Sequence, residues 1–330
     1  VTSDELETVK QHIINGEDIV DDSSYDDVYY YHPGGELRIT QETQRESDYV
    51  RYTDYETAET GVRYTDKNGT WTRSTFTSRA DDVTITKISA SDTGTKVDLT
   101  LSFDDISVMA NYNDGNEKDM QYKKIVADDC EYIAFVAHYP NYENSELKNG
   151  GYATLTYVIT QGGTKEKISG KAVDDEQYAA EDNPQIQITD ADQVYLITVS
   201  DRTYEMGALA DFAAAQEYAL VNELADDCKA VAQKYSQSGA FDYDAALNAH
   251  TALHQPQFDA VTFTLNGGSS NASNETLLKN ARGEDDISSA LAQRAFYSGR
   301  YAYLCCAGTS TSRLYGMWTG EWNTSWGSKY

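Results

Sequence analysis

Three tryptophans near the end of the sequence, Trp318, Trp322 and Trp326, have the spacing and the neighbours of a sugar-binding surface. They stand four residues apart beside Glu321 and Asn323, although the 330-residue chain holds only 4 tryptophans. The C–H faces of a sugar ring stack on aromatic side chains, while polar neighbours hydrogen-bond the hydroxyl groups. The pattern therefore favours a sugar as the ligand. The alternative is a group of aromatic residues packed into the chain's own core.

Two histidines, His250 and His254, stand four residues apart on a predicted helix, a spacing that can hold a zinc ion. No acidic residue or third histidine follows at helical spacing, so we predict no metal site. Phosphate-binding and dinucleotide fingerprints are also absent from the sequence, and no nucleophile stands on a glycine-flanked turn. We therefore expect no cofactor. We assign no catalytic residue, because the many carboxylates do not single out an acid/base pair.

The charge of the chain limits the partners that it can bind. The net charge is −28, from 54 acidic and 26 basic residues. Such a surface repels nucleic acid and anionic lipid, so we expect neither as a partner. No run of about 18 apolar residues is present to span a membrane, so we expect no membrane insertion. Apolar residues make up 40% of the chain, enough for a sizeable core.

Four cysteines stand at positions 130, 228, 305 and 306, without the spacing of a zinc site. Adjacent cysteines rarely bond each other without backbone strain, so we predict that Cys305 and Cys306 are small buried residues. The sequence leaves open whether Cys130 and Cys228 form a disulfide.

The elements that must position these residues change in kind along the chain. From residue 37 to about residue 200, apolar and polar residues alternate with the period of β-strands, and Asn68-Gly69 predicts a two-residue hairpin. No helical period interrupts this run, so we predict a large antiparallel β-sandwich. The strands are expected near residues 51–66, 70–78, 83–89, 96–103, 130–139, 152–160, 166–173 and 193–200.

Helical periods dominate the rest of the sequence. A short amphipathic helix is predicted over residues 4–15, and an alanine-rich helix over residues 205–236. A further helix over 243–255 is expected to end at Pro256, because proline lacks the backbone N–H that a helix needs. Residues 261–267 then predict a short strand, and a helical pattern resumes at about Asn274.

Five parts of the chain match the motifs of one enzyme family in collinear order. They are the proline-glycine turn and strand over residues 31–39, the strands over 51–89, the junction over 249–267 and the segments over 298–304 and 315–330. Together they resemble glycoside hydrolase family 95, the α-L-fucosidase and α-L-galactosidase family. The resemblance covers nearly the whole chain. The residues that match the family's motifs from the junction onward are His250, Phe258, Asp259, Val261, Leu265, Gly299, Arg300, Tyr301, Gly316, Trp318, Trp326, Ser328 and Tyr330.

The resemblance implies a fold in three parts. Residues 1–204 would form most of a β-super-sandwich, beginning after the family's first strands, and residues 205–258 a helical linker. Residues 259–330 would begin an (α/α)6 catalytic barrel. The fold class is therefore mainly β, with helices at the end. Trp318 and Trp326 would lie at the lip of the barrel, so Trp318, Trp326 and Asn323 are the predicted substrate-binding residues.

The chain departs from the family's pattern at several positions. Ser74 stands where the family has a glutamate, and residues 305–309 replace a Ser-Ser-Arg-Pro-Gly loop. Arg313 and Tyr315 replace an asparagine and a glutamine. The groups that position the attacking water and the catalytic acid would follow Tyr330. The resemblance thus places no catalytic residue in this chain, which is expected to be inactive by itself.

The expected function follows from the resemblance. The chain would be the N-terminal portion of a secreted bacterial glycoside hydrolase that cleaves terminal α-L-fucosides or similar sugars with inversion. Its partner would be a glycan substrate, and its location secreted or on the cell surface. The alternative is a non-catalytic carbohydrate-binding or cell-surface structural module, and a third reading is an assembly subunit that uses exposed strand edges. The sequence leaves the oligomeric state open.

Overall fold

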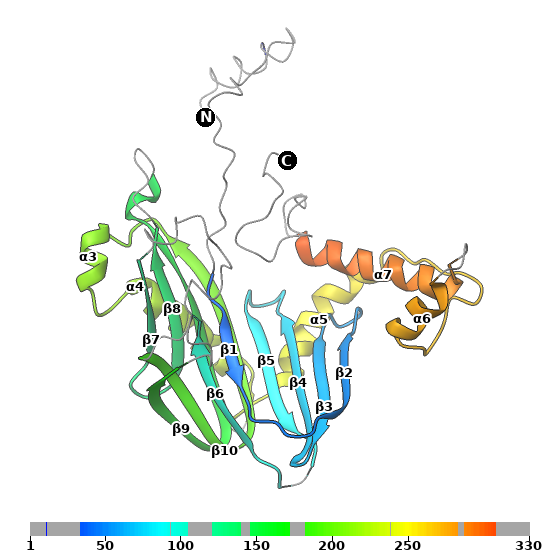
Figure 1. Ribbon diagram of the computed structural model, residues 1–330. Helices are drawn as coiled ribbons and strands as arrows, with labels where there is room; N and C mark the ends of the chain where they lie inside the picture. Colours follow the sequence, from blue (N-terminus) through cyan, green and yellow to red (C-terminus); the bar gives the residue numbers. More distant parts are fainter. Residues whose placement is uncertain are drawn as a thin grey trace.

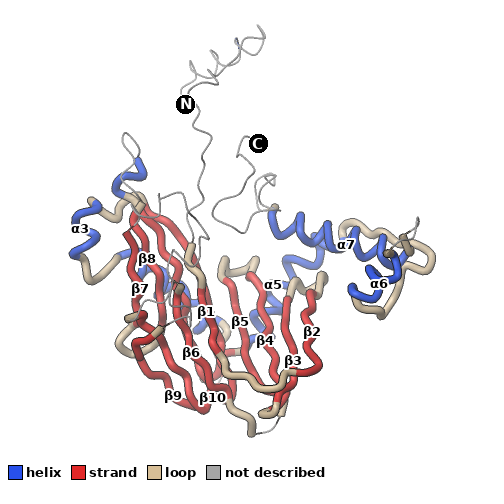
Figure 2. The backbone as a smooth tube through the Cα atoms, viewed as in Figure 1, coloured by secondary structure: helices blue, strands red, loops and turns tan. Residues whose placement is uncertain are grey.

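The chain is mainly β, with one ten-stranded antiparallel sheet followed by helices (Figures 1 and 2). This confirms the predicted fold class. The computed structural model describes Gln11 and residues 34–92, 94–104, 121–139, 146–171, 182–237, 239–282 and 287–307. The predicted helix over residues 4–15 lies outside this part of the chain apart from Gln11.

The strands of the sheet are connected mostly to their neighbours in sequence. Their order is β2-β3-β4-β5-β10-β9-β8-β7, and β6 pairs with both β1 and β10. The strands are β1 (Leu37–Thr40), β2 (Ser47–Thr53), β3 (Thr60–Asp66), β4 (Gly69–Thr77), β5 (Thr84–Ala90), β6 (Val97–Phe103), β7 (Gln121–Val126), β8 (Tyr132–His138), β9 (Gly151–Gly170) and β10 (Asn183–Thr203).

The long hairpin of β9 and β10 folds the sheet into a sandwich. The two strands pair along their whole length, while the other edge of β10 pairs first with β6 and then with β5. The register shifts between these two partners. There Gly162 and Gly163 of β9 have φ values of 67° and 69°, and Asp190 of β10 has a φ of 58°. Such bulges bend a strand, so the two parts of this hairpin belong to different layers of the sandwich.

The bend creates two leaves, which we call the short leaf and the long leaf. The short leaf consists of β1, β6 and the adjoining parts of β10 and β9. The long leaf consists of β2, β3, β4, β5, the remaining parts of β10 and β9, β8 and β7. Their facing side chains form one core, which includes Leu101 and Ile186 of the short leaf and Phe135, Val158 and Leu196 of the long leaf.

A second core covers the outer face of the long leaf. Side chains of β8 alternate, so Phe135 faces the sandwich interior while Ala134 and Val136 face the helices. Helix α4 packs on β8, β9 and β10, and in Figure 1 α5 lies behind β3, β4 and β5. The helices therefore extend the fold by a third layer.

Three of the described α-helices begin where a short polar side chain caps them. Asp242 accepts a hydrogen bond from the backbone N of Ala245 at 2.9 Å, and Ser288 accepts one from Leu291 at 3.2 Å. The helices are α3 (Leu209–Ala214), α4 (Ala219–Lys234), α5 (Tyr243–Asp259), α6 (Asn274–Ala281) and α7 (Ser289–Cys306), together with the 3-10 helix η2 (Glu146–Asn149) and the short hairpin of β11 (Ser236–Gln237) and β12 (Ala240–Phe241).

Two helix predictions were wrong in their extent. The segment over residues 205–236 forms two helices, because the chain is extended between α3 and α4, where Tyr218 donates a hydrogen bond to the carbonyl of Ala215. Helix α5 continues beyond Pro256 to Asp259. Arg300 explains the second result, because its guanidinium donates to the carbonyls of Gln257 and Phe258 in the last turn.

The predicted strand over residues 261–267 was also wrong. The backbone N of Phe263 donates to the Tyr297 hydroxyl at 3.0 Å, and that of Leu265 donates to Gln293 Oε1 at 3.0 Å. Side chains of α7 therefore take the hydrogen bonds that a neighbouring strand would otherwise supply.

The cysteines differ in part from expectation. All four are free thiols, so Cys130 and Cys228 do not pair although both are buried. Cys305 is exposed and Cys306 half-buried, against the prediction that both would be buried. No helix in the described part of the chain combines the length and the apolar character needed to cross a membrane.

Candidate functional site

The predicted substrate-binding residues Trp318, Asn323 and Trp326 lie outside the described residues, which end at Ala307. Their role stays a prediction. The structure does describe two other segments that resemble family 95 motifs, one on α5 and one on α7. It brings His250, His254 and Phe258 of α5 together with Arg300 and Tyr301 of α7. We call this contact between the sandwich and the C-terminal helices the junction.

The two histidines of the junction are buried side chains that hold α5 on the long leaf. Each is only 1% exposed, and their rings stack with centroids 5.5 Å apart. His250 Nδ1 accepts a hydrogen bond from the backbone N of Arg79 at 3.0 Å, and His254 Nε2 lies 2.9 Å from the carbonyl O of Tyr55. Arg79 and Tyr55 belong to turns between strands, so α5 is fastened to two turns of the long leaf.

Arg79 connects three elements of the junction. From the β4–β5 turn, its Nε lies 3.4 Å from His254 Nδ1 and its Nη2 donates to the carbonyl of Leu304 on α7 at 2.8 Å. Tyr301 of α7 completes the contact, with its ring centroid 5.1 Å from that of Tyr55. The Gly-Arg-Tyr motif of α7 therefore packs the helix against α5 and the sandwich.

The histidine pair is unsuited to proton transfer at neutral pH. Burial, followed by the nearby His254 and Arg79, lowers the pKa of His250 to about 4. Burial also lowers the pKa of His254. Among the described residues no group of three histidine, cysteine, aspartate or glutamate side chains could hold a metal ion. The pair is thus a structural contact of neutral rings.

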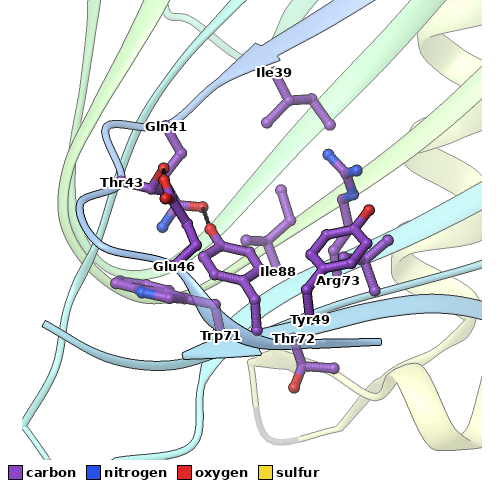
Figure 3. Close-up of a pocket in the computed structure, with 11 residues that line it drawn as sticks. Ile39, Gln41, Thr43, Glu46, Tyr49, Trp71, Thr72, Arg73 and Ile88 are labelled. Carbon is purple, nitrogen blue, oxygen red and sulfur yellow. Dashed lines mark hydrogen bonds between the residues drawn. The ribbon is translucent and has the colours of Figure 1, made fainter. Parts of the chain in front are cut away.

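A separate cleft opens in the sandwich where the long leaf extends beyond the short leaf (Figure 3). Its floor is the inner face of β3, β4 and β5, and its walls are β1, the connection over residues 41–46 and Tyr49 of β2. The cavity measures about 240 Å³ and adjoins a second cavity of about 730 Å³, with Gln41 and Trp71 lining both. We call these two adjoining cavities together the sandwich cleft.

Asp66 organises the floor of the sandwich cleft. Its carboxylate accepts hydrogen bonds from the indole Nε1 of Trp71 at 2.9 Å and from the backbone N of Asn68 at 2.8 Å. Burial by itself would raise the pKa of Asp66, but these bonds outweigh it and the pKa is lowered, so the carboxylate stays charged. The bonds hold the ring of Trp71 in one orientation, beside the β3–β4 turn.

This cleft was not predicted from the sequence, although the pattern of its strands indicates part of it. Strand alternation about the hairpin at Asn68-Gly69 predicts that Tyr64, Trp71 and Arg73 share one face. The register confirms it, since Tyr64 pairs with Trp71 and Val62 with Arg73. The sequence does not show that the facing leaf stops short of this part of the sheet.

Two family models match the chain, one after the other. Residues 4–207 match the glycosyl hydrolase family 65, N-terminal domain, and residues 242–330 match the glycosyl hydrolase family 95 catalytic domain. The second match agrees with the resemblance in that part of the chain, whereas over residues 4–207 the matching family is 65. No curated protein matches the chain.

Several solved structures resemble the chain at low sequence identity. An enzyme from the human microbiome described as a kojibiose phosphorylase is 8% identical, with a TM-score of 0.38 over 68% of this chain and 27% of its own. A bacterial glucoamylase complexed with acarbose is 14% identical, with a TM-score of 0.34 over 65% and 29%. A GH92 inverting mannosidase from Bacteroides thetaiotaomicron is 13% identical, with a TM-score of 0.24 over 53% and 22%. The chain thus spans less than a third of the length of each enzyme.

Proposed function

The chain belongs to the family of the glycosyl hydrolase family 65, N-terminal domain, and on this premise we propose that it is the N-terminal portion of a secreted bacterial glycoside hydrolase. The observation that carries the proposal is the order of the two family matches. An N-terminal-domain match over residues 4–207 is followed by a catalytic-domain match over residues 242–330. The change from strands to helices falls between β10 and α3.

The proposed activity is hydrolysis of terminal α-L-fucosides, or of similar sugars, with inversion at the anomeric carbon. In such a reaction a carboxylic acid protonates the leaving oxygen while a positioned water attacks the opposite face of the sugar. The family 95 resemblance gives neither group a counterpart in these 330 residues. Trp318, Trp326 and Asn323 are the proposed sugar contacts.

In this proposal the sandwich supports the helices of the catalytic domain. Arg79 and Tyr55, on two turns of the long leaf, contact α5 and α7, two of the three described helices within the family 95 match. A catalytic domain that contains these helices is therefore supported by the sandwich through partly buried, directional hydrogen bonds. Preorganised support of this kind keeps catalytic groups at fixed distances.

Assays of the 330-residue chain and of the complete product of its gene test the proposal. We expect the complete product to hydrolyse an aryl α-L-fucoside and to release the β-anomer first, as followed by NMR. The 330-residue chain should give no turnover, because the family 95 resemblance gives the acid and the water-positioning groups no counterpart in it. Turnover by this chain, or initial release of the α-anomer, would contradict the proposal. Secretion is tested by locating the complete product in the medium or on the cell surface.

A further inference from the structure

We propose that the sandwich cleft is a second carbohydrate-binding site, which takes the end of a neutral oligosaccharide. The site is distinct from the sugar contacts proposed for the terminal tryptophans. Its position follows from the topology, since β1 is the edge of the short leaf and leaves the inner faces of β2, β3 and β4 without a facing strand. Binding here requires no catalytic group, so this inference stands apart from the hydrolase activity.

The aromatic residues of the cleft provide surfaces for stacking. Tyr49, on the edge strand β2, is 59% exposed, Tyr64 is half-buried, and Trp71 is 4% exposed at the floor. The exposed ring of Tyr49 is therefore available to a ligand. The buried ring of Trp71 forms a floor that excludes water. Sugar rings stack on such surfaces through their C–H faces.

Hydrogen-bonding groups converge on the same space. Arg73, Gln41 and Glu46 line the cleft beside the aromatic rings (Figure 3). The guanidinium of Arg73 and the amide nitrogen of Gln41 have no hydrogen-bond partner among the described residues. The Glu46 carboxylate, on an exposed residue, accepts a hydrogen bond from the Thr43 hydroxyl. Donors and a carboxylate that remain available within one cavity match the paired hydroxyls of a sugar.

Several contacts hold the walls in place before a ligand arrives. On β1, Arg38 Nε donates to Asp104 Oδ1 at 2.8 Å, and the Asp104 side chain is 1% exposed. Across the cleft, the Tyr64 hydroxyl donates to Gln41 Oε1 at 3.2 Å, and Asp66 holds Trp71. Because these groups are fixed beforehand, a ligand loses less conformational entropy in ordering them.

Charge and size identify the kind of ligand. Glu46 and Arg73 bring opposite charges to the cleft, and the chain as a whole carries −28, so an anionic glycan is repelled. The adjoining cavity is lined mainly by threonine, asparagine and glutamine side chains, together with two acidic residues and one lysine, and it shares Gln41 and Trp71 with the first. The two volumes, about 240 and about 730 Å³, suit more than one sugar unit. A neutral oligosaccharide satisfies all these conditions.

The test is calorimetric titration of the 330-residue chain with 2′-fucosyllactose, cellotetraose and mannotetraose, and with 3′-sialyllactose as the charged probe. We expect binding of at least one neutral probe in the micromolar to millimolar range and no binding of the charged one. Tyr49→Ala and Arg73→Ala should each weaken binding about tenfold, equivalent to the loss of about 1.4 kcal/mol. Both side chains are exposed, so the variants should fold, which far-UV circular dichroism can check.

A control variant makes the outcome specific. Tyr204→Ala removes an exposed tyrosine that does not line the cleft and should leave binding unchanged. The proposal fails if no neutral probe binds at millimolar concentration, if 3′-sialyllactose binds equally well, or if binding is unchanged in both Tyr49→Ala and Arg73→Ala. Failure of fucoside hydrolysis by the complete product would leave this result unaffected.

Discussion

Replacement of Gly163 by alanine is expected to lower the free energy of unfolding by about 3 kcal/mol, measured by urea denaturation. Gly163 lies at the bend of β9 with a φ of 69°, where a side chain costs conformational energy. A Cβ there would also overlap the carbonyl O of Thr189 and lie 2.6 Å from the backbone N of Ala191. Both obstacles are backbone atoms of the paired strand β10, so neither can rotate away.

A matched variant separates the two contributions. Gly239 has a φ of 85°, and a Cβ built on it meets no atom within 4 Å. Gly239→Ala should therefore lose only the conformational part, about 1 kcal/mol. Equal effects at the two positions would show that the close approach of β9 and β10 does not constrain residue 163.

Acid should destabilise the folded chain through His250. Its pKa is about 4 in the folded chain, because of burial and then of the neighbouring His254 and Arg79, against about 6.5 in an unfolded one. At a pH between these two values, His250 is protonated in the unfolded chain but stays neutral in the folded chain. The stabilising contribution is therefore complete above pH 6.5 and is lost as the pH falls towards 4. From pH 7 to pH 5 the free energy of unfolding should drop by about 2 kcal/mol from this residue.

His250→Asn isolates this effect. The amide oxygen of asparagine can accept the hydrogen bond that the backbone N of Arg79 gives to Nδ1, but it does not titrate. Urea denaturation at pH 7, 6 and 5 should show a pH dependence that is about 2 kcal/mol smaller in the variant. The contributions of His254 and of the carboxylates are common to both proteins and cancel in the difference. Identical pH dependence would exclude His250 as the source.

Local patterns in the sequence predicted most of the element types, but not β7 or the irregular segment over residues 261–267. The alternation over residues 60–77 corresponds to β3 and β4, and the hairpin signal of Asn68-Gly69 is confirmed by their pairing. The helical periods after residue 204 correspond to α3 to α7. Alternation and helical period report which face of an element is buried, and this information is present in each segment by itself.

The connection of these elements into leaves could not be predicted, because it depends on contacts between distant segments. Segments 152–160 and 166–173 were expected to be separate strands, but Gly162 and Gly163 bend one strand, β9, and do not end it. The sandwich cleft results from the same bend, which limits the short leaf. The boundaries of the three predicted parts, at residues 204 and 258, and the role of Trp318, Trp326 and Asn323 stay predictions.

The helices that cover the outer face of the long leaf determine how far the chain can be shortened. The family 65 match ends at residue 207, but Ile85, Val136 and Ile197 of the sheet are buried with side chains of α4 and α5, which end only at Asp259. A fragment ended at residue 207 would expose the apolar outer face of β4, β5, β8, β9 and β10, and such faces promote aggregation. The segment that matches the family 65 model is therefore too short to form a soluble fragment. A stable fragment must extend at least to Asp259.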